Sequence, residues 1–186
     1  MSAGITLLIG GVRAGKSGRS LELADEHSAG GKVLFVATAQ SFDDEMRRRI
    51  DAHRRERAAR SWQTLESPLD VVNDITACAG RSRSYAAIVI DCLTVWVSNV
   101  LLTLPDDADA ETHIAGEARR LLRVLADLRA DGARVILVTN EVGLGIVPAT
   151  PLGRRYRDAL GRVNQLAAEA SDETILMVAG LELRLK

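Results

Sequence analysis

Aromatic residues and cysteines are scarce in this chain of 186 residues, and long apolar runs are absent from it. Only six aromatic residues occur, which leaves little material for a surface that stacks nucleic-acid bases. Two cysteines, Cys78 and Cys92, are too few for a disulfide framework in a chain that can bury a core, so we expect both to be reduced. No run reaches the roughly 18 residues of a membrane-spanning helix, and the first residues lack the basic segment of a signal peptide. We therefore expect a cytoplasmic protein without a membrane span.

Net charge is also small, because 24 basic residues face 25 acidic ones and leave a balance of −1. This balance gives no reason to expect non-specific attraction to nucleic acid or to a membrane surface. Lysine itself is rare: it occurs only at Lys16, Lys32 and Lys186, against 21 arginines. A motif that requires lysine therefore has few chances to arise by accident.

Short apolar runs alternate with longer stretches of helical spacing, and this pattern is typical of a parallel sheet with helices on its faces. The length predicts one domain over residues 1–186. The predicted strands are 5–9, 33–37, 86–90, 135–139 and 175–179, with 181–185 turning back as an antiparallel edge hairpin. The predicted helices are 17–27, 42–59, one from Ser67 and Pro68 to about residue 78, 93–104, 111–130 and 152–170. We predict an α/β fold like that of P-loop NTPases.

A phosphate-binding motif stands between the first strand and the first helix. The pattern G-x-x-x-x-G-K-[ST] is matched by Gly10, Gly11, Val12, Arg13, Ala14, Gly15, Lys16 and Ser17. In such a loop the backbone N–H groups face the phosphates, the lysine reaches the β and γ oxygens, and the hydroxyl ligates Mg²⁺. We therefore predict a site for ATP or GTP with Mg²⁺.

A P-loop also needs a carboxylate to hold the metal, usually an Asp at the end of a neighbouring buried strand. Asp91 ends the apolar run 87–90 and is the first candidate, although an Asp there can simply cap the next helix. Glu141 follows the next strand in the same topological position and is the competitor. Parallel strands deliver their carboxyl ends to one crevice, so both can face the site.

The segment 47–60 carries seven arginines against two acidic residues, a local charge of +5. A charge run of this kind is usually a solvated helix face, and an inward histidine is more often a packed core residue than a catalyst. His53, however, shares a helix face with Met46 and Ile50, and Arg49 and Arg57 lie four residues away on either side. Arginines at that spacing can hold phosphates beside an imidazole.

Two further patterns limit the function. A regulatory GTPase is not expected, because N-K-x-D is absent and the only D-x-x-G, residues 158–161, lies inside a predicted helix. The stretch 140–148 is rich in glycine and follows a strand end, so it is either a lid or substrate surface or a plain connector.

Several segments together resemble one family, the bifunctional adenosylcobinamide kinase/adenosylcobinamide-phosphate guanylyltransferase of cobalamin biosynthesis. They span nearly the whole chain in order, and their combination is far more specific than the P-loop alone. The matching pieces are 10–17, 37–40, 43–46 with Arg49, Ile50, His53 and Arg54, Trp62 with Thr64 and Glu66, 139–148, and 157–165 at Arg157, Asp158, Gly161, Arg162, Asn164 and Gln165.

The resemblance implies two reactions. Adenosylcobinamide is phosphorylated with ATP or GTP, and GMP is then transferred from GTP onto adenosylcobinamide phosphate through a covalent histidine, which falls on His53. The nucleotide is implied to contact Ala37, Thr38, Ala39, Arg54, Glu66 and Asp91 besides the P-loop, and the family forms homotrimers. Two alternatives remain open from the residues alone: a single-function P-loop kinase of another metabolite, and a RecA-like ATPase or nucleotide sensor.

Overall fold

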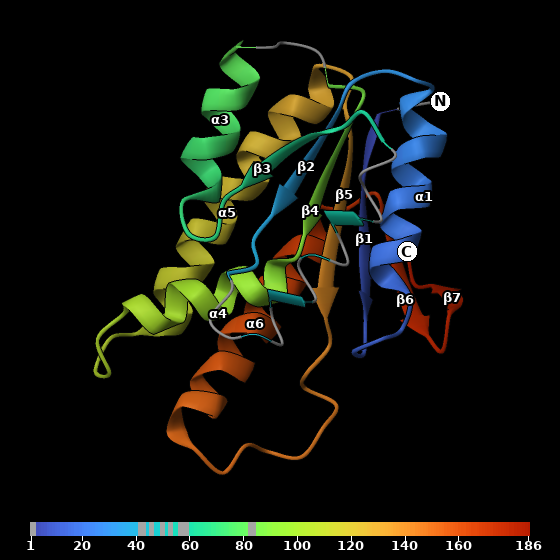
Figure 1. The fold of residues 1–186 in the computed structure, drawn as a ribbon. Helices are drawn as coiled ribbons and strands as arrows, with labels where there is room; N and C mark the ends of the chain where they lie inside the picture. The colour runs from blue at the N-terminus through green and yellow to red at the C-terminus, as the bar shows by residue number, and fades with distance from the viewer. Residues whose placement is uncertain are drawn as a thin grey trace.

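The computed structural model describes residues 3–40, 44, 47–48, 51, 54–55, 60–81 and 85–186. Strands and helices alternate along most of the chain (Figure 1). In chain order the elements are β1 (Gly4–Gly10), α1 (Lys16–Ser28), β2 (Val33–Ala37), β3 (Gln63–Glu66), α3 (Val71–Arg81), β4 (Ala87–Asp91), α4 (Leu93–Thr103), α5 (Ala110–Ala130), β5 (Arg134–Asn140), α6 (Pro151–Ala170), β6 (Glu173–Val178) and β7 (Leu181–Arg184).

The strands form one seven-stranded sheet in the order β3-β2-β4-β5-β1-β6-β7. Every neighbouring pair is parallel except β6 and β7, which form an antiparallel hairpin at one edge. The predicted fold class is therefore confirmed, including the antiparallel C-terminal edge.

Helices cover both faces of the sheet. On one face α3, α4, α5 and α6 bury the larger core, while α1 packs on the other face against β1, β4 and β5 (Figure 1). The central strands are buried on both sides, which explains why they are continuous apolar runs instead of alternating ones. No helix in the described part of the chain has the length and apolar character needed to cross a bilayer.

The strand register places the predicted site residues along one edge. Ala37 at the end of β2 pairs with Asp91 of β4 on one side and with Glu66 of β3 on the other. Asp91 in turn pairs with Val138 of β5, and Gly10 of β1 pairs with Asn140. The carboxyl ends of the parallel strands thus form a continuous row in front of the P-loop.

Two features of the sequence-based prediction are wrong. The strand β3 was not expected, because its sequence is polar and three of its four residues are exposed at the edge of the sheet. The helix predicted to start at Pro68 begins only at Val71, since tertiary hydrogen bonds engage the preceding residues: the backbone N–H of Ser67 donates to the carbonyl of Ala37 at 2.9 Å. The predicted helix 42–59 falls largely outside the described residues; those described between 44 and 55 are helical.

Candidate functional site

The P-loop joins the end of β1 to the start of α1 and depends on two glycines. A Cβ at Gly10 would collide with the carbonyl oxygen of Met177 on β6, so only glycine fits where these two strands meet. Gly15 has φ of 95°, a left-handed conformation that glycine adopts without steric cost, and it caps α1. The loop therefore ends at a helix N-terminus whose first N–H groups lack partners within the helix, an arrangement suited to phosphate.

Lys16 lies at the floor of this loop. Its side chain is buried, with the residue only 6% exposed, and its Nζ donates to the carbonyl oxygens of Gly10 at 2.9 Å and Gly11 at 2.6 Å. Burial lowers the pKa of the Lys16 ammonium, and the nearby Asp91 carboxylate opposes that shift. The lysine is thus held against the loop backbone, within the wall of the adjoining cavity.

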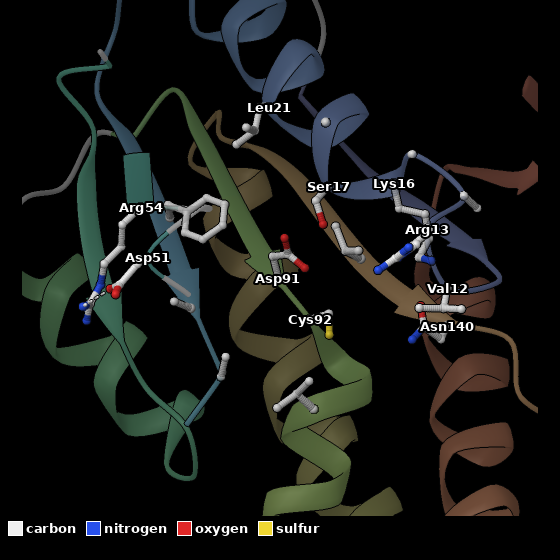
Figure 2. Close-up of a pocket in the computed structure, with 18 of the residues that line it drawn as sticks. Val12, Arg13, Lys16, Ser17, Leu21, Asp51, Arg54, Asp91, Cys92 and Asn140 are labelled. Carbon is white, nitrogen blue, oxygen red and sulfur yellow. Dashed lines mark ion pairs between the residues drawn. The ribbon is translucent and has the colours of Figure 1, made fainter. Parts of the chain in front are cut away.

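A cavity of about 1280 Å³ opens at the carboxyl edge of the sheet, in front of the P-loop. Figure 2 shows Lys16 and Arg13 on one side of it, Asp91 near the middle, and Arg54 with Asp51 on the opposite side. The sequence-predicted residues in its lining are Val12, Arg13, Ala14, Gly15, Lys16, Ser17, Ala37, Ala39, Arg54, Glu66 and Asp91. The cavity therefore brings together residues from the P-loop, the ends of three strands and the arginine-rich segment.

The two oxygen donors predicted to bind the metal both line this cavity. In Figure 2 the carboxylate of Asp91 and the hydroxyl of Ser17 point toward one another across the space between β4 and the start of α1. Glu141, the competing carboxylate, is not part of the lining, and its carboxylate instead accepts a hydrogen bond from the backbone N–H of Gly143. Of the two candidates, Asp91 is the one that faces the P-loop.

The wall opposite the P-loop is built from exposed charged side chains. Arg54 forms an ion pair with Glu66 at the end of β3, and its guanidinium lies 3.6 Å from the carboxylate of Asp51 (Figure 2). The hydrogen bond to Glu66 raises the pKa of the Arg54 guanidinium above its ordinary value. Arg47 and Arg60 also line the cavity, and each is paired with a carboxylate, Arg47 with Asp44 and Arg60 with Asp25 of α1.

His53 lies outside the described residues, as do Arg49 and Arg57. The adjacent Arg54 is described and lines the cavity. Cys92 lines the cavity and carries a thiol, but burial, and then the neighbouring Asp91, raise its pKa to about 12. At neutral pH Cys92 therefore stays a protonated thiol and is a poor nucleophile.

Thr38 does not line the cavity, in contrast to Ala37 and Ala39 on either side of it. It is fully buried, and its hydroxyl donates to the Cys92 carbonyl oxygen at 2.8 Å and accepts from the Cys92 N–H at 2.9 Å. These bonds tie the end of β2 to the end of β4. The role that the structure gives the Thr38 side chain is to hold this edge together.

Asn99 on α4 is a residue that the sequence analysis missed. It is only 4% exposed, and its amide donates to the carbonyl of Thr38 at 2.8 Å and to that of Pro68 at 3.0 Å. One side chain thus fixes the two segments that carry Ala37, Ala39 and Glu66. An asparagine within a largely apolar helix is the sequence signal that would have identified it, because a buried amide requires partners.

A second buried network supports the end of β5. The Thr139 hydroxyl donates to the Asn164 amide oxygen at 2.7 Å, and the Asn164 amide donates to the Asn140 carbonyl at 3.0 Å. The Asn140 N–H donates to the hydroxyl of Thr94 at 2.6 Å. Helices α4 and α6 therefore both hold the backbone of Asn140, which lines the cavity beside the P-loop (Figure 2).

The parallel sheet, the glycine loop that leads into α1 and the facing Asp91 define the class: a nucleotide-binding protein of the P-loop type. Within that class, residues 6–185 match the model of the CobU family, cobinamide kinase / cobinamide phosphate guanyltransferase. The chain belongs to this family.

Comparison with individual proteins agrees with this family match. The chain is 42% identical over 180 residues to the bifunctional adenosylcobalamin biosynthesis protein CobP of Pseudomonas aeruginosa, covering 97% of this chain and 96% of that protein. It is 38% identical to CobU of Salmonella typhimurium and 36% identical to CobU of Escherichia coli, over 97% of this chain and 98% of each relative. These matches select the bifunctional transferase over the two alternatives that the residues alone left open.

Proposed function

We propose that this protein phosphorylates adenosylcobinamide and then converts the phosphate to adenosylcobinamide-GDP through a guanylylated His53. Cobinamide kinase and cobinamide-phosphate guanylyltransferase are the activities of its family, and they use nucleotide substrates. The observation that carries the proposal for this chain is a single cavity lined by the P-loop, by Asp91 and by Arg54, the neighbour of His53 in the sequence.

In the kinase reaction, the loop residues 10–17 bind the β- and γ-phosphates of ATP or GTP. Lys16 would leave the carbonyls of Gly10 and Gly11 and donate to phosphate oxygens, which stabilises the negative charge that develops on them. The acceptor hydroxyl attacks the γ-phosphorus, the bond from that phosphorus to the β-phosphate oxygen breaks, and the hydroxyl proton leaves to solvent. The products are the nucleoside diphosphate and adenosylcobinamide phosphate.

Ser17 and Asp91 fit a magnesium ion, because a hydroxyl and a carboxylate that face one cavity are the oxygen ligands that Mg²⁺ takes beside substrate phosphates. No group of three or more His, Cys, Asp or Glu side chains in the described residues could form a complete metal cage. A magnesium ion at Ser17 and Asp91 would be held by these two side chains and by the nucleotide. Bound there, the ion would neutralise phosphate charge.

In the transferase reaction, a neutral imidazole nitrogen of His53 attacks the α-phosphorus of GTP. A P–N bond forms, the bond to the β-phosphate oxygen breaks and pyrophosphate leaves. An oxygen of adenosylcobinamide phosphate then attacks the same phosphorus and displaces the histidine. Arg54 and Arg47 supply positive charge on this side of the cavity, and Glu66 and Asp91 are carboxylates available to the nucleoside.

The remaining nucleotide contacts come from the end of β2. Ala37 and Ala39 line the cavity and have no side chain beyond Cβ, so a nucleotide can approach their backbone closely. Thr38, between them, contributes through the backbone position that its bonds to Cys92 fix.

Labelling with α-³²P GTP tests the covalent step. We expect the wild type to retain label that is labile in acid and stable in alkali, as a phosphoramidate is, and His53→Ala to retain none. His113→Ala, at an exposed position on α5, is the matched control and should label as the wild type does. Label on His53→Ala would refute this nucleophile, and a wild type that phosphorylates adenosylcobinamide without taking up label would indicate a single-function kinase.

The protein is also proposed to assemble as a homotrimer and to act in the cytoplasm. The resemblance to the family supports a homotrimer, and the small number of cysteines supports a reducing compartment such as the cytoplasm. Light scattering coupled to size-exclusion chromatography measures the first directly: a mass of three chains is expected, and a monomer would contradict it.

A further inference from the structure

The segment 141–150, which joins β5 to α6, presents apolar side chains to solvent. It projects from the body of the molecule at the carboxyl edge of the sheet (Figure 1). Leu144 is 88% exposed and Ile146 is 94% exposed, and Val147 is also exposed. Leu144 and Ile146 are the most exposed large apolar side chains of the described residues, ahead of Leu181, Leu183 and Leu185 at the C-terminal edge of the sheet. Exposed apolar patches of this kind mark binding surfaces.

The segment is braced in this shape by polar contacts. The guanidinium of Arg154 donates to the carbonyls of Pro148 at 3.0 Å and Ala149 at 2.9 Å. The hydroxyl of Thr150 accepts from the N–H of Gly153 at 3.2 Å and so caps α6. The backbone is therefore anchored next to the apolar residues without any of those residues being buried.

This surface begins at the phosphate end of the nucleotide cavity. The N–H of Glu141 donates to the carbonyl of Gly10 in the P-loop at 3.2 Å, and the preceding residue, Asn140, lines the cavity. Val12, another exposed apolar residue, lines the same cavity as Asn140. The segment therefore starts at the P-loop end of the cavity, and a ligand resting on it can reach the cavity past Asn140.

We propose that Leu144, Ile146 and Val147, together with Val12, form the docking surface for the corrin ring of the acceptor. The inference rests on the proposed function. The acceptor is a bulky macrocycle whose reacting hydroxyl is at the end of a flexible arm. Because the nucleotide occupies the cavity at the P-loop, the ring is held outside while the arm reaches in. The methylated rim of the ring matches apolar side chains, and its amide groups can bond to the open backbone of the segment.

The test compares two sets of variants in the full-length protein. Leu144→Gln with Ile146→Gln removes the apolar surface, and Leu102→Gln is the matched control, since Leu102 is an exposed residue on α4 that does not line the cavity. Cobinamide binding is measured by equilibrium dialysis from the absorbance of the corrin, in the presence of a non-hydrolysable ATP analogue. Affinity for the analogue and the mass of the assembly are measured in parallel.

We expect the double variant to bind cobinamide at least tenfold more weakly than the wild type, with unchanged affinity for the analogue and unchanged mass. The control should match the wild type in all three measurements. Unchanged cobinamide affinity in the double variant would overturn the inference, and so would a lower assembly mass, which would assign the surface to a second copy of the chain. Failure of the wild type to bind or phosphorylate cobinamide would instead refute the proposed function.

Discussion

The two walls of the nucleotide cavity are built in different ways. On the P-loop side the wall consists of backbone, of a buried lysine bonded to two carbonyls and of a glycine that fits against β6. On the opposite side it consists of exposed side chains, where Arg54 is shared between the carboxylates of Glu66 and Asp51. The first wall is fixed by packing, whereas the second is held by contacts that water and ligands can replace.

This difference indicates that the two walls contribute differently to nucleotide binding. At the P-loop the backbone is already in place, so the main change that a triphosphate would require there is that Lys16 exchanges the carbonyls of Gly10 and Gly11 for phosphate oxygens. At the opposite wall a nucleotide competes with ion pairs that already exist, and each exposed pair contributes little to the stability of the fold. The second wall can therefore change its contacts between the two reactions without unfolding the edge that supports it.

The largest expected effect is at Lys16, in the fixed wall. Lys16→Met keeps the length of the side chain and removes its charge, so we expect kcat/KM of the kinase reaction to fall about a thousandfold. The thermal midpoint should move by only a few degrees, because removing a buried charge spares its desolvation. Lys32→Met, at the amino end of β2, is the control. A loss below tenfold would contradict the role given to Lys16.

The next largest effect is a loss of stability in the segments that support the wall opposite the P-loop. Asn99→Ala leaves the carbonyls of Thr38 and Pro68 without their donor, so we expect the free energy of unfolding to fall by about 2–4 kcal/mol. Urea unfolding followed by circular dichroism measures it. Asn73→Ala is the matched control, since the Asn73 amide bonds to the exposed Asp70 carboxylate, and it should cost less than about 0.5 kcal/mol. Equal effects of the two variants would show that Asn99 does not anchor this wall.

A smaller effect is expected within the second wall itself. Glu66→Gln removes a carboxylate from the cavity. We expect KM for GTP in guanylyl transfer to rise about tenfold, because the hydrogen bond that the nucleoside would donate to the Glu66 carboxylate becomes one to a neutral amide oxygen. The thermal midpoint should stay where it is, since the ion pair with Arg54 is exposed. Glu117→Gln, which breaks an exposed pair with Arg120 on α5, controls for the lost charge. A lower midpoint with an unchanged KM would reverse this interpretation.

The smallest effect lies far from both walls, at the end of α1. Burial, and then the charge of Arg134, lower the pKa of His27, so the folded protein favours the neutral imidazole. As the pH falls below the unfolded value of about 6.5, the unfolded chain takes up a proton that the folded chain resists, and stability is lost until the pH passes the lower folded pKa. His27→Gln should therefore show a flatter decline in unfolding free energy between pH 7.5 and 5 than the wild type. His113→Gln should decline as the wild type does, and parallel curves for all three proteins would refute the assignment.

Sequence patterns predicted the parts of this fold that arise from local chemistry. The apolar run 33–37 matches β2 at both ends, and the lysine-containing loop lies between β1 and α1 as expected. The buried parallel strands are readable because both of their faces need apolar residues. Parallel strands end on the same side of a sheet, which is why the sequence placed Asp91, at the end of β4, at the edge where the P-loop lies.

What the sequence did not predict depends on contacts between distant residues. The strand β3 is polar and follows the arginine-rich segment, so only its pairing with β2 defines it. The side chain of Thr38 turns away from the cavity because of Cys92, which is 54 residues further along the chain. The segment before Val71 bends instead of forming a helical turn, and α4 binds its carbonyl groups: the Asn99 amide donates to that of Pro68 and the Trp96 indole N–H donates to that of Leu69. No local pattern contains these partners.

The close contact between Gly10 and Met177 also determines when the sheet around β1 can form during synthesis. β1 is the first strand to be synthesised, yet both of its neighbours in the sheet, β5 and β6, come from the last third of the chain. The N–H of Gly180 donates to the carbonyl of Ala14, so the final hairpin also closes against the P-loop. During translation the P-loop therefore cannot take its final shape until nearly the whole chain has left the ribosome. A product that stops before β6 has every residue of the phosphate motif but lacks the strand against which the motif takes its shape.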